Sequence, residues 1–218
     1  SVITAHDGSR VDALIVGVPA SATSISETGA DATPGAIRKA LARYSLAHSH
    51  SAVNLEKVKI ADAGDVISPD IDEDATISLL RSARLKSTLL IALGGDNSIT
   101  YATHMGAEAT GLITLDAHYD LRDGISNGSP VRRLIEAGLS GKRVVQIGIA
   151  DFSNSPEYAA RAKEYGITVI PRSELRGANL PEIWSRALAI AGDRIHVDFD
   201  MDVCDRSVVP ACPAAAPG

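Results

Sequence analysis

The sequence predicts an α/β fold in which helices cover both faces of a mostly parallel central sheet, a three-layer αβα sandwich. Short apolar runs alternate with helical stretches about seven times along the chain, which is typical of repeated β–α units. These runs are apolar throughout rather than alternating with polar residues, as strands buried on both faces of a parallel sheet are. A chain of 218 residues suits one sizeable domain, so we expect a single domain over residues 1–218.

The first half of the chain contains three well-marked features. Val11 to Val18 is an apolar run closed by Pro19 and predicts the first strand. Residues 20–32 are rich in Ser, Thr and Gly and predict a long loop. Thr33 as cap and Pro34 at the first helical position predict a helix over residues 35–42. Further elements are expected as strands over 58–61 and 88–93 and as helices over 72–86 and 99–109.

The second half continues the same alternation. Strands are expected over 111–115, 144–149, 167–170 and 194–199, and helices over 130–137, 156–165 and 180–191. The last stretch, 202–218, is rich in Pro and Ala and is expected to be irregular. Because it ends on Pro217-Gly218 without a closing helix, we expect that the chain lacks the C-terminal part of the domain.

Composition and charge exclude several classes of partner. The formal net charge is −6, and no Lys/Arg cluster is interleaved with aromatic residues, so nucleic acid is not an expected partner. Apolar runs are far shorter than the roughly 20 residues of a membrane span, so we expect neither a membrane span nor a secretory signal. The two cysteines, Cys204 and Cys212, are expected to be reduced, and we expect a cytoplasmic protein.

The first candidate site follows the apolar run 111–115. In an extended segment residues two apart share a face, so Asp116, His118 and Asp120 are expected to point the same way. Two carboxylates and an imidazole offer oxygen and nitrogen ligands to a divalent cation. The alternative is a capped strand end with salt-bridged acids.

A second acidic stretch places Asp198, Asp200 and Asp202 on one face of another predicted strand. Three neighbouring acids repel one another and lose solvation unless a cation lies between them. A nucleophilic Asp-x-Asp motif is a competing interpretation, although such a motif normally opens a domain. Acid-bearing stretches follow three predicted strands, after Leu93, Leu115 and Phe199. Because ligands bind at the carboxyl ends of parallel strands, the sequence favours one metal site there.

Three motifs resemble the ureohydrolase superfamily of arginases, agmatinases and formimidoylglutamases. They are Gly-Gly-Asp-Asn at 94–97, Asp-Ala-His-Tyr-Asp at 116–120 and the acidic stretch 198–206. The resemblance implies an arginase-like fold and a site for two Mn²⁺ ions. It implies that Asp116 and Asp200 bridge the ions, that His118 and Asp202 bind one and that Asp120 binds the other. Asn97 is then a further ligand candidate, and Asp198 a neighbour of the site.

Two residues depart from the superfamily pattern. Asn97 stands where the superfamily has a His ligand, so it is either a weaker ligand to the second ion or a helix cap after the Gly94-Gly95 turn. Asn127 stands where arginase-like and agmatinase-like members carry a His. These departures, with the Arg and Ser residues that follow the second motif, make the chain most similar to formimidoylglutamases.

The activity implied by the resemblance is manganese-dependent hydrolysis of N-formimidoyl-L-glutamate to L-glutamate and formamide. Asp120 and His118 are the expected catalytic residues, with Asp120 passing the water proton towards the leaving nitrogen. The substrate carries two carboxylates, for which Arg122 is the first candidate partner. Further substrate-binding candidates are Asn127, Ser129 and Arg132.

Two alternative functions remain open. One is an agmatinase or guanidino-acid ureohydrolase that releases urea. The other is a non-catalytic protein of the same fold with a metal site impaired at Asn97. A homo-oligomer acting on a small amidine or guanidine is expected under the enzymatic readings.

Overall fold

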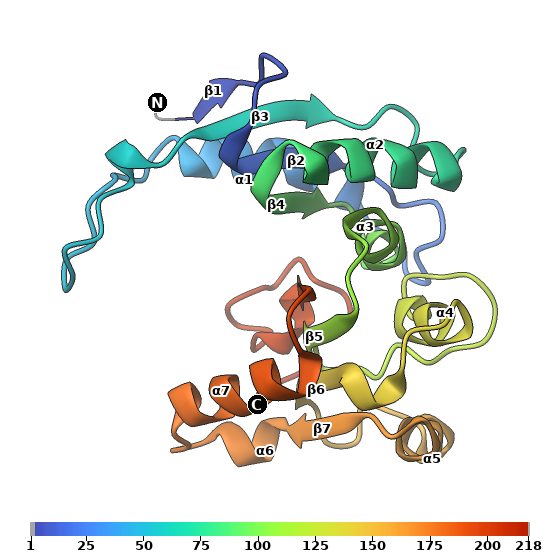
Figure 1. Ribbon diagram of the computed structural model, residues 1–218. Coiled ribbons are helices and arrows are strands. Elements are labelled where there is room, and N and C mark those ends of the chain that lie inside the picture. Colours follow the sequence, from blue (N-terminus) through green and yellow to red (C-terminus); the bar gives the residue numbers. More distant parts are fainter. Residues whose placement is uncertain (1–2, 218) are drawn as a thin grey trace. The chain divides into compact units, whose positions relative to one another are not determined.

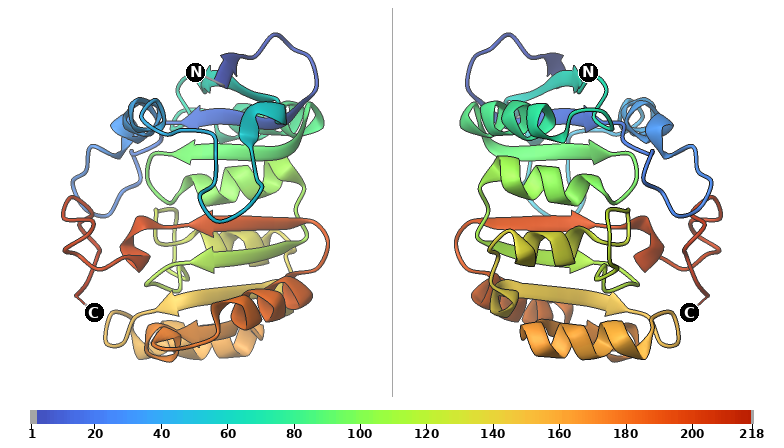
Figure 2. Two further views of the ribbon diagram at one scale, coloured as in Figure 1. Left: turned by 90° about the vertical axis from the view of Figure 1, so that its left-hand side faces the viewer. Right: turned by 90° about the vertical axis from the view of Figure 1, so that its right-hand side faces the viewer.

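The computed structural model describes residues 3–217, which form two compact units. The first unit contains residues 3–23 and 29–107, and the second contains residues 24–28 and 108–217. Each unit is built on a four-stranded sheet whose strands all run in the same direction (Figure 1, Figure 2). The expectation of a single domain over the whole chain stays a prediction.

In the first unit the strand order is β1-β3-β2-β4. The strands are β1 (Ile3–Ala5), β2 (Val11–Val18), β3 (Ile60–Asp65) and β4 (Ser87–Gly94), and the helices are η1 (Ala30–Ala32), α1 (Thr33–Leu41), η2 (Leu55–Lys57), α2 (Glu73–Leu85) and α3 (Ile99–Ala107). Leu14, Val16 and Val18 of β2 form a core with apolar residues of α2 and α3. On the opposite face Gly17 lies against Pro34 of α1.

In the second unit the strand order is β7-β6-β5-β8. The strands are β5 (Gly111–Leu115), β6 (Val144–Ile149), β7 (Thr168–Pro171) and β8 (Ile195–Phe199), and the helices are α4 (Pro130–Glu136), η3 (Gly141–Arg143), α5 (Pro156–Tyr165), α6 (Arg172–Leu175), α7 (Leu180–Ala191) and η4 (Met201–Val203). Ile113, Val145 and Ile147 pack against Ala187 and Ala191 of α7. Figure 1 shows α4 and α5 on the other side of this sheet. Parallel sheets with helices on both faces confirm the predicted three-layer α/β class.

Most predicted elements are present, and the errors have local causes. The bounds of β2, β5, β6, α5 and α7 agree with the prediction. The assignment of Thr33 as a cap is wrong, because Thr33 is the first residue of α1 and Ala32 precedes it without a side-chain cap. Strand β1 and helix α6 were not predicted, since three and four residues are too short to show a period.

Two further expectations concern the environment of the chain. None of the helices within residues 3–217 is both long enough and apolar enough to cross a membrane. Cys204 and Cys212 are not joined by a disulfide, and their reduced state stays a prediction.

Candidate metal centre

The acidic residues of the second unit are brought together by the pairing of β5 with β8. Leu115 lies opposite Phe199 in this parallel register, so Asp116 and Asp200 follow neighbouring strands at the same edge of the sheet. The Asp200 N–H donates to the carbonyl of Leu115 at 3.0 Å. The Asp116 N–H donates to the carbonyl of Ile147 on β6, also at 3.0 Å. The two predicted bridging residues therefore leave the sheet side by side.

Asp116, His118 and Asp202 form a cluster with the spacing of a metal site. Each offers one ligand atom, and these atoms all lie within 4.8 Å of one another. His118 Nδ1 is 2.7 Å from Asp202 Oδ2 and 3.7 Å from Asp116 Oδ1. Asp116 and Asp202 are almost fully buried, at 1% and 3% exposed. The structure thus joins the second and third sequence motifs at one point.

The same carboxylates also shape the backbone around them. Asp116 Oδ1 accepts from the His118 N–H at 2.6 Å, and Asp200 Oδ1 accepts from the Asp202 N–H at 2.9 Å, which starts η4. Asp202 Oδ1 accepts from the Ala117 N–H at 3.0 Å and so ties η4 to the loop after β5. These acids therefore also cap the strand ends, as the alternative to a metal site expects, and the same side chains form the cluster.

Asp120 occupies a backbone conformation that few side chains adopt. Its φ is +54°, in the left-handed region that Asp tolerates better than most residues. It is 7% exposed. Burial first, and then the charges of Asp116, Asp200, Asp198 and Asp202, raise its pKa well above 3.8. A strained, buried carboxyl among other carboxyls is a feature of functional sites rather than of ordinary turns.

The electrostatics of the cluster are those of acids in need of positive charge. Burial, followed by the charges of Asp200 and Asp202, raises the pKa of Asp116, although His118 works in the opposite direction. The neighbouring carboxylates of Asp116 and Asp202 raise the pKa of His118 to about 10. Burial works against ionisation of Asp202, but the His118 ring outweighs it and lowers the pKa of that carboxyl. One imidazole thus serves several carboxylates.

This donor set fits hard divalent cations. Carboxylate oxygens with one imidazole suit Mn²⁺ and disfavour metals that prefer thiolates. Asp116, His118 and Asp202 present these atoms toward one another, and Asp120 and Asp200 lie close enough for their charges to act on the same group. The residues of the second unit therefore fit the group that the resemblance implies.

Asn97 belongs to the first unit, where it follows the end of β4. The turn that carries it passes close to another loop, because a Cβ on Gly95 would lie 1.8 Å from the carbonyl oxygen of Ala20. The Asn97 amide oxygen accepts from the Thr100 hydroxyl at 2.9 Å, at the start of α3. This local contact resembles the capping alternative, and ligation by Asn97 stays a prediction.

Arg122 is exposed, and its guanidinium lies near an aromatic ring. Its guanidinium carbon lies 5.9 Å from the centre of the Tyr158 ring, a cation–π contact, and Arg161 lies 5.8 Å from the same ring. Within residues 3–217 no carboxylate forms an ion pair with Arg122. A Cβ on Gly128 would lie 2.8 Å from Arg122 Cδ, so the Arg122 side chain passes close over this glycine.

The other three substrate-binding candidates make contacts within the protein. Arg132 is 9% exposed, and its guanidinium donates to the carbonyls of Arg122 and Gly124 and pairs with Glu136. The Asn127 amide oxygen accepts from the Ile25 N–H at 3.1 Å. The fully buried Ser129 hydroxyl donates to the carbonyl of Ser126 at 2.8 Å. Their direct contact with substrate stays a prediction.

Two residues near the centre have no counterpart among the predicted ones. Asn154, in the loop before α5, and Gln146, in β6, hydrogen-bond through their amides to the backbone between the candidate ligands. Neither belongs to an acidic or histidine-containing motif, so the sequence offers no signal for them.

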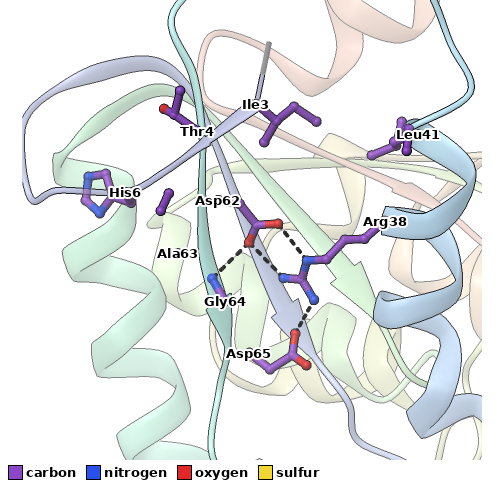
Figure 3. A pocket seen from close by; sticks show the side chains of 11 residues that line it. Ile3, Thr4, His6, Arg38, Leu41, Asp62, Ala63, Gly64 and Asp65 are labelled. Carbon is purple, nitrogen blue, oxygen red and sulfur yellow. Dashed lines mark hydrogen bonds and ion pairs between the residues drawn. The ribbon is translucent and has the colours of Figure 1, made fainter. Parts of the chain in front are cut away.

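A separate cavity lies in the first unit, between α1, β1 and the end of β3 (Figure 3). Its volume is about 790 Å³. Arg38 donates to both oxygens of Asp62, at 2.6 and 2.9 Å, and to Asp65 at 2.5 Å. The acids here are paired with a guanidinium, which distinguishes this cavity from the acid–imidazole cluster of the second unit.

The parallel α/β fold and the acid–imidazole cluster at its strand ends define a known class of protein. The chain belongs to the arginase family, whose profile matches residues 11–218. A formimidoylglutamase of Halalkalibacterium halodurans is 37% identical, over 97% of this chain and 72% of the relative. The crystal structure of Bacillus subtilis formimidoylglutamase superposes with a TM-score of 0.89 at 32% identity, over 99% of this chain and 73% of that one. A Trypanosoma cruzi formiminoglutamase with Mn²⁺ has a TM-score of 0.87 at 24% identity, over 95% and 76%, a likeness of fold.

Proposed function

We propose that this protein is a manganese-dependent hydrolase that cleaves N-formimidoyl-L-glutamate to L-glutamate and formamide. Similarity to formimidoylglutamases over almost the whole chain supports the substrate. The observation that carries the chemistry is the cluster of the buried Asp116 and Asp202 with the half-buried His118, whose ligand atoms lie within 4.8 Å of one another. Asp116, His118, Asp120, Asp200 and Asp202 would hold two Mn²⁺ ions, with Asn97 as a weaker additional ligand.

The metal ions supply Lewis acidity, which makes water a nucleophile near neutral pH. Asp120 accepts the proton of the attacking water and delivers it to the nitrogen that leaves with glutamate. The left-handed backbone at Asp120 fixes the direction in which its carboxyl leaves the loop. His118 Nδ1 and Asp202 Oδ2 lie 2.7 Å apart, so the two donor atoms face one another where an ion would bind. Hydrolysis breaks the C–N bond between the formimidoyl carbon and the glutamate nitrogen.

Arg122 binds a carboxylate of the substrate. Its guanidinium has no ion-pair partner within residues 3–217, lies against Tyr158 and follows Asp120 by two residues. Arg132 acts differently, because its guanidinium holds the carbonyls of Arg122 and Gly124 and so fixes the loop that presents Arg122. This division of roles explains why two Arg residues of opposite exposure occur near one site.

A substrate panel tests the function. The purified protein with added Mn²⁺ is incubated with N-formimidoyl-L-glutamate, agmatine, L-arginine and a guanidino acid, and formamide, ammonia and urea are measured. Formamide and glutamate in equal amounts support the proposal. Ammonia in place of formamide contradicts the stated products. Urea from agmatine or a guanidino acid identifies the alternative ureohydrolase, and the absence of both turnover and Mn²⁺ uptake identifies the non-catalytic alternative.

A cytoplasmic location and a homo-oligomeric state are further parts of this proposal. The two free thiols suit a reducing compartment. Trp184 and Leu188 of α7 and Phe199 of β8 are exposed apolar side chains of the kind that subunit contacts cover. Light scattering on the purified chain measures the assembly, and a monomer at all concentrations would contradict the oligomer.

A further inference from the structure

We propose that Asn154 and Gln146 are positioning residues, which together hold the loop between the candidate metal ligands in its ligand-presenting shape. This inference rests on the proposed function, because the loop matters only if His118 and Asp120 bind the ions. It assigns a role to two side chains that would not themselves touch a metal ion or the substrate.

The peptide groups on both sides of His118 are held by these two amides. Asn154 Nδ2 donates to the carbonyl of Ala117 at 2.9 Å, and Asn154 Oδ1 accepts from the N–H of Tyr119 at 3.1 Å. Gln146 Nε2 donates to the carbonyl of Tyr119 at 2.9 Å. The single side chain of Asn154 therefore hydrogen-bonds to the peptide groups before and after His118, as donor to the first and acceptor from the second.

The loop needs such support because it has left the sheet. Strand β5 ends at Leu115, and beyond it the backbone keeps two hydrogen bonds to β6 and the residue that follows β6: the Asp116 N–H donates to the Ile147 carbonyl and the Ala150 N–H donates to the Ala117 carbonyl, each at 3.0 Å. Tyr119 and Asp120, which has a positive φ, lie beyond these bonds and outside any strand. Backbone groups that are withdrawn from water require partners, and here side-chain amides provide them for Tyr119. The alternation of held residues and ligands is regular: Ala117 and Tyr119 are fixed, and His118 and Asp120 lie on either side of Tyr119.

The two amides come from places that are themselves rigid. Gln146 is fully buried in β6 and lies opposite Thr114 of β5 in the parallel register. Asn154 immediately precedes Ser155, whose hydroxyl caps α5 by accepting from the Tyr158 N–H. The candidate ligands are thus held in place by contacts to β6 and to the start of α5, and not by the loop alone.

Asn154→Leu and Ser155→Ala form a matched pair for testing this role. Both alter the same turn, but only the first removes the hydrogen bonds to Ala117 and Tyr119. For Asn154→Leu we expect Mn²⁺ affinity to fall about 10–100-fold, the range found for residues that orient metal ligands. The Ser155→Ala cap variant is expected to lower thermal stability while its Mn²⁺ affinity stays near that of the unaltered protein.

Amide hydrogen exchange in metal-free protein gives a readout independent of activity and of Mn²⁺. The Tyr119 N–H donates directly to Asn154, so its exchange should accelerate at least about tenfold in Asn154→Leu and stay slow in Ser155→Ala. Asn154→Asp keeps the acceptor and should retain this protection, which supplies a second variant if Asn154→Leu does not fold. Gln146→Met should weaken Mn²⁺ binding while leaving the Asn154 contact in place.

The outcomes separate this inference from the proposed function. Normal Mn²⁺ affinity together with unchanged Tyr119 exchange in Asn154→Leu would overturn the positioning role. Equal losses of Mn²⁺ affinity in Asn154→Leu and Ser155→Ala would also overturn it, since general loosening of the turn would then suffice. If the unaltered protein takes up no Mn²⁺, the proposed function fails, while Tyr119 exchange still tests whether the two amides hold the loop.

Discussion

Both units have acids on or directly after their parallel strands, but the charge of these acids is balanced in different ways. In the first unit Asp62 and Asp65 share the guanidinium of Arg38. In the second unit Asp116 and Asp202 share the imidazole of His118, with other acids close by. The first group carries its own counter-charge, whereas the second has more carboxylates than the imidazole can neutralise.

The pKa values follow this difference. Burial opposes ionisation of Asp62, but hydrogen bonds from Arg38 outweigh it and lower the pKa of that carboxyl. Burial and neighbouring acids instead raise the pKa of Asp116 and Asp120. An acid whose pKa is lowered stabilises the fold as it stands, and one whose pKa is raised is stabilised by a bound cation. This difference favours a structural role for Asp62 and supports the proposed metal-binding role of Asp116 and Asp120, whereas the pKa of Asp202 is lowered because the His118 ring pairs with it.

A substitution at Asp200 tests the difference between the two acidic groups most directly. Asp200→Asn keeps the hydrogen bond to the Asp202 N–H but removes a charge from the site. We expect kcat/KM to fall by more than about 100-fold, beyond the range for residues that merely orient ligands. Steady-state kinetics with saturating Mn²⁺ measure this. Asp65→Asn in the first unit is the matched control and should keep its activity; equal losses in the two variants would remove the distinction between the groups.

The second-largest effect is expected at Arg122, whose guanidinium forms no ion pair with an acid within residues 3–217. Arg122→Met should raise KM about 10–100-fold with little change in kcat, because a charge-assisted hydrogen bond to the substrate contributes about 1.5–3 kcal/mol. Lys163→Met removes a positive charge from the surface of α5 and serves as control. A fall in kcat at constant KM would argue that Arg122 does not bind the substrate.

A substitution at Arg38 tests whether the acids of the first unit have a structural role. Arg38→Leu leaves Asp62 without its partner and should lower the free energy of unfolding by roughly 1–3 kcal/mol, measured by denaturant titration. Because the pKa of Asp62 is lowered in the fold, its contribution is present above 3.8 and is lost as pH falls through the lowered value. The difference in the free energy of unfolding between the unaltered protein and Arg38→Leu should therefore shrink in acid. Activity per folded molecule should not change.

Asn97→His should produce the smallest change of the series. If Asn97 is a weak ligand, as the resemblance implies, imidazole in its place should tighten the second equivalent of Mn²⁺, which titration calorimetry detects. The hydrogen bond to Thr100 is the competing role. Unchanged stoichiometry and affinity would favour that capping role.

Much of the fold could be predicted because its signals are local. Apolar runs give β2, β5 and β6 their bounds, and Pro at the first turn marks the start of α5. Short elements such as β1 escape prediction, because three residues show no period. The pairing of strands is a long-range property, and the sequence indicates only that the sheets are parallel.

The candidate site also contains residues that local sequence signals identify and residues that only the three-dimensional structure identifies. Asp116, His118 and Asp202 could be identified because acids and histidine at strand ends leave a visible pattern, and the structure brings them together. The amides of Asn154 and Gln146 leave no such pattern, since Asn and Gln are common in loops and strands alike. The guanidinium of Arg132, which the sequence associates with substrate, is directed to backbone carbonyls by a loop geometry that spacing does not show.

The stabilisation of the protein by Mn²⁺ as a function of pH tests the central claim most directly. Asp116, Asp120 and His118 have raised pKa values, His118 to about 10, so each contributes stability below its ordinary value and loses it as pH rises. Asp202 acts in the opposite sense, and its contribution is already complete above its ordinary value of 3.8.

Unfolding free energies measured with EDTA and with Mn²⁺, at about pH 5.5 and about pH 8.5, should therefore differ more at the higher pH. Asp200→Asn should narrow that difference. An unfolding free energy that is the same with EDTA and with Mn²⁺ at both pH values would contradict the account.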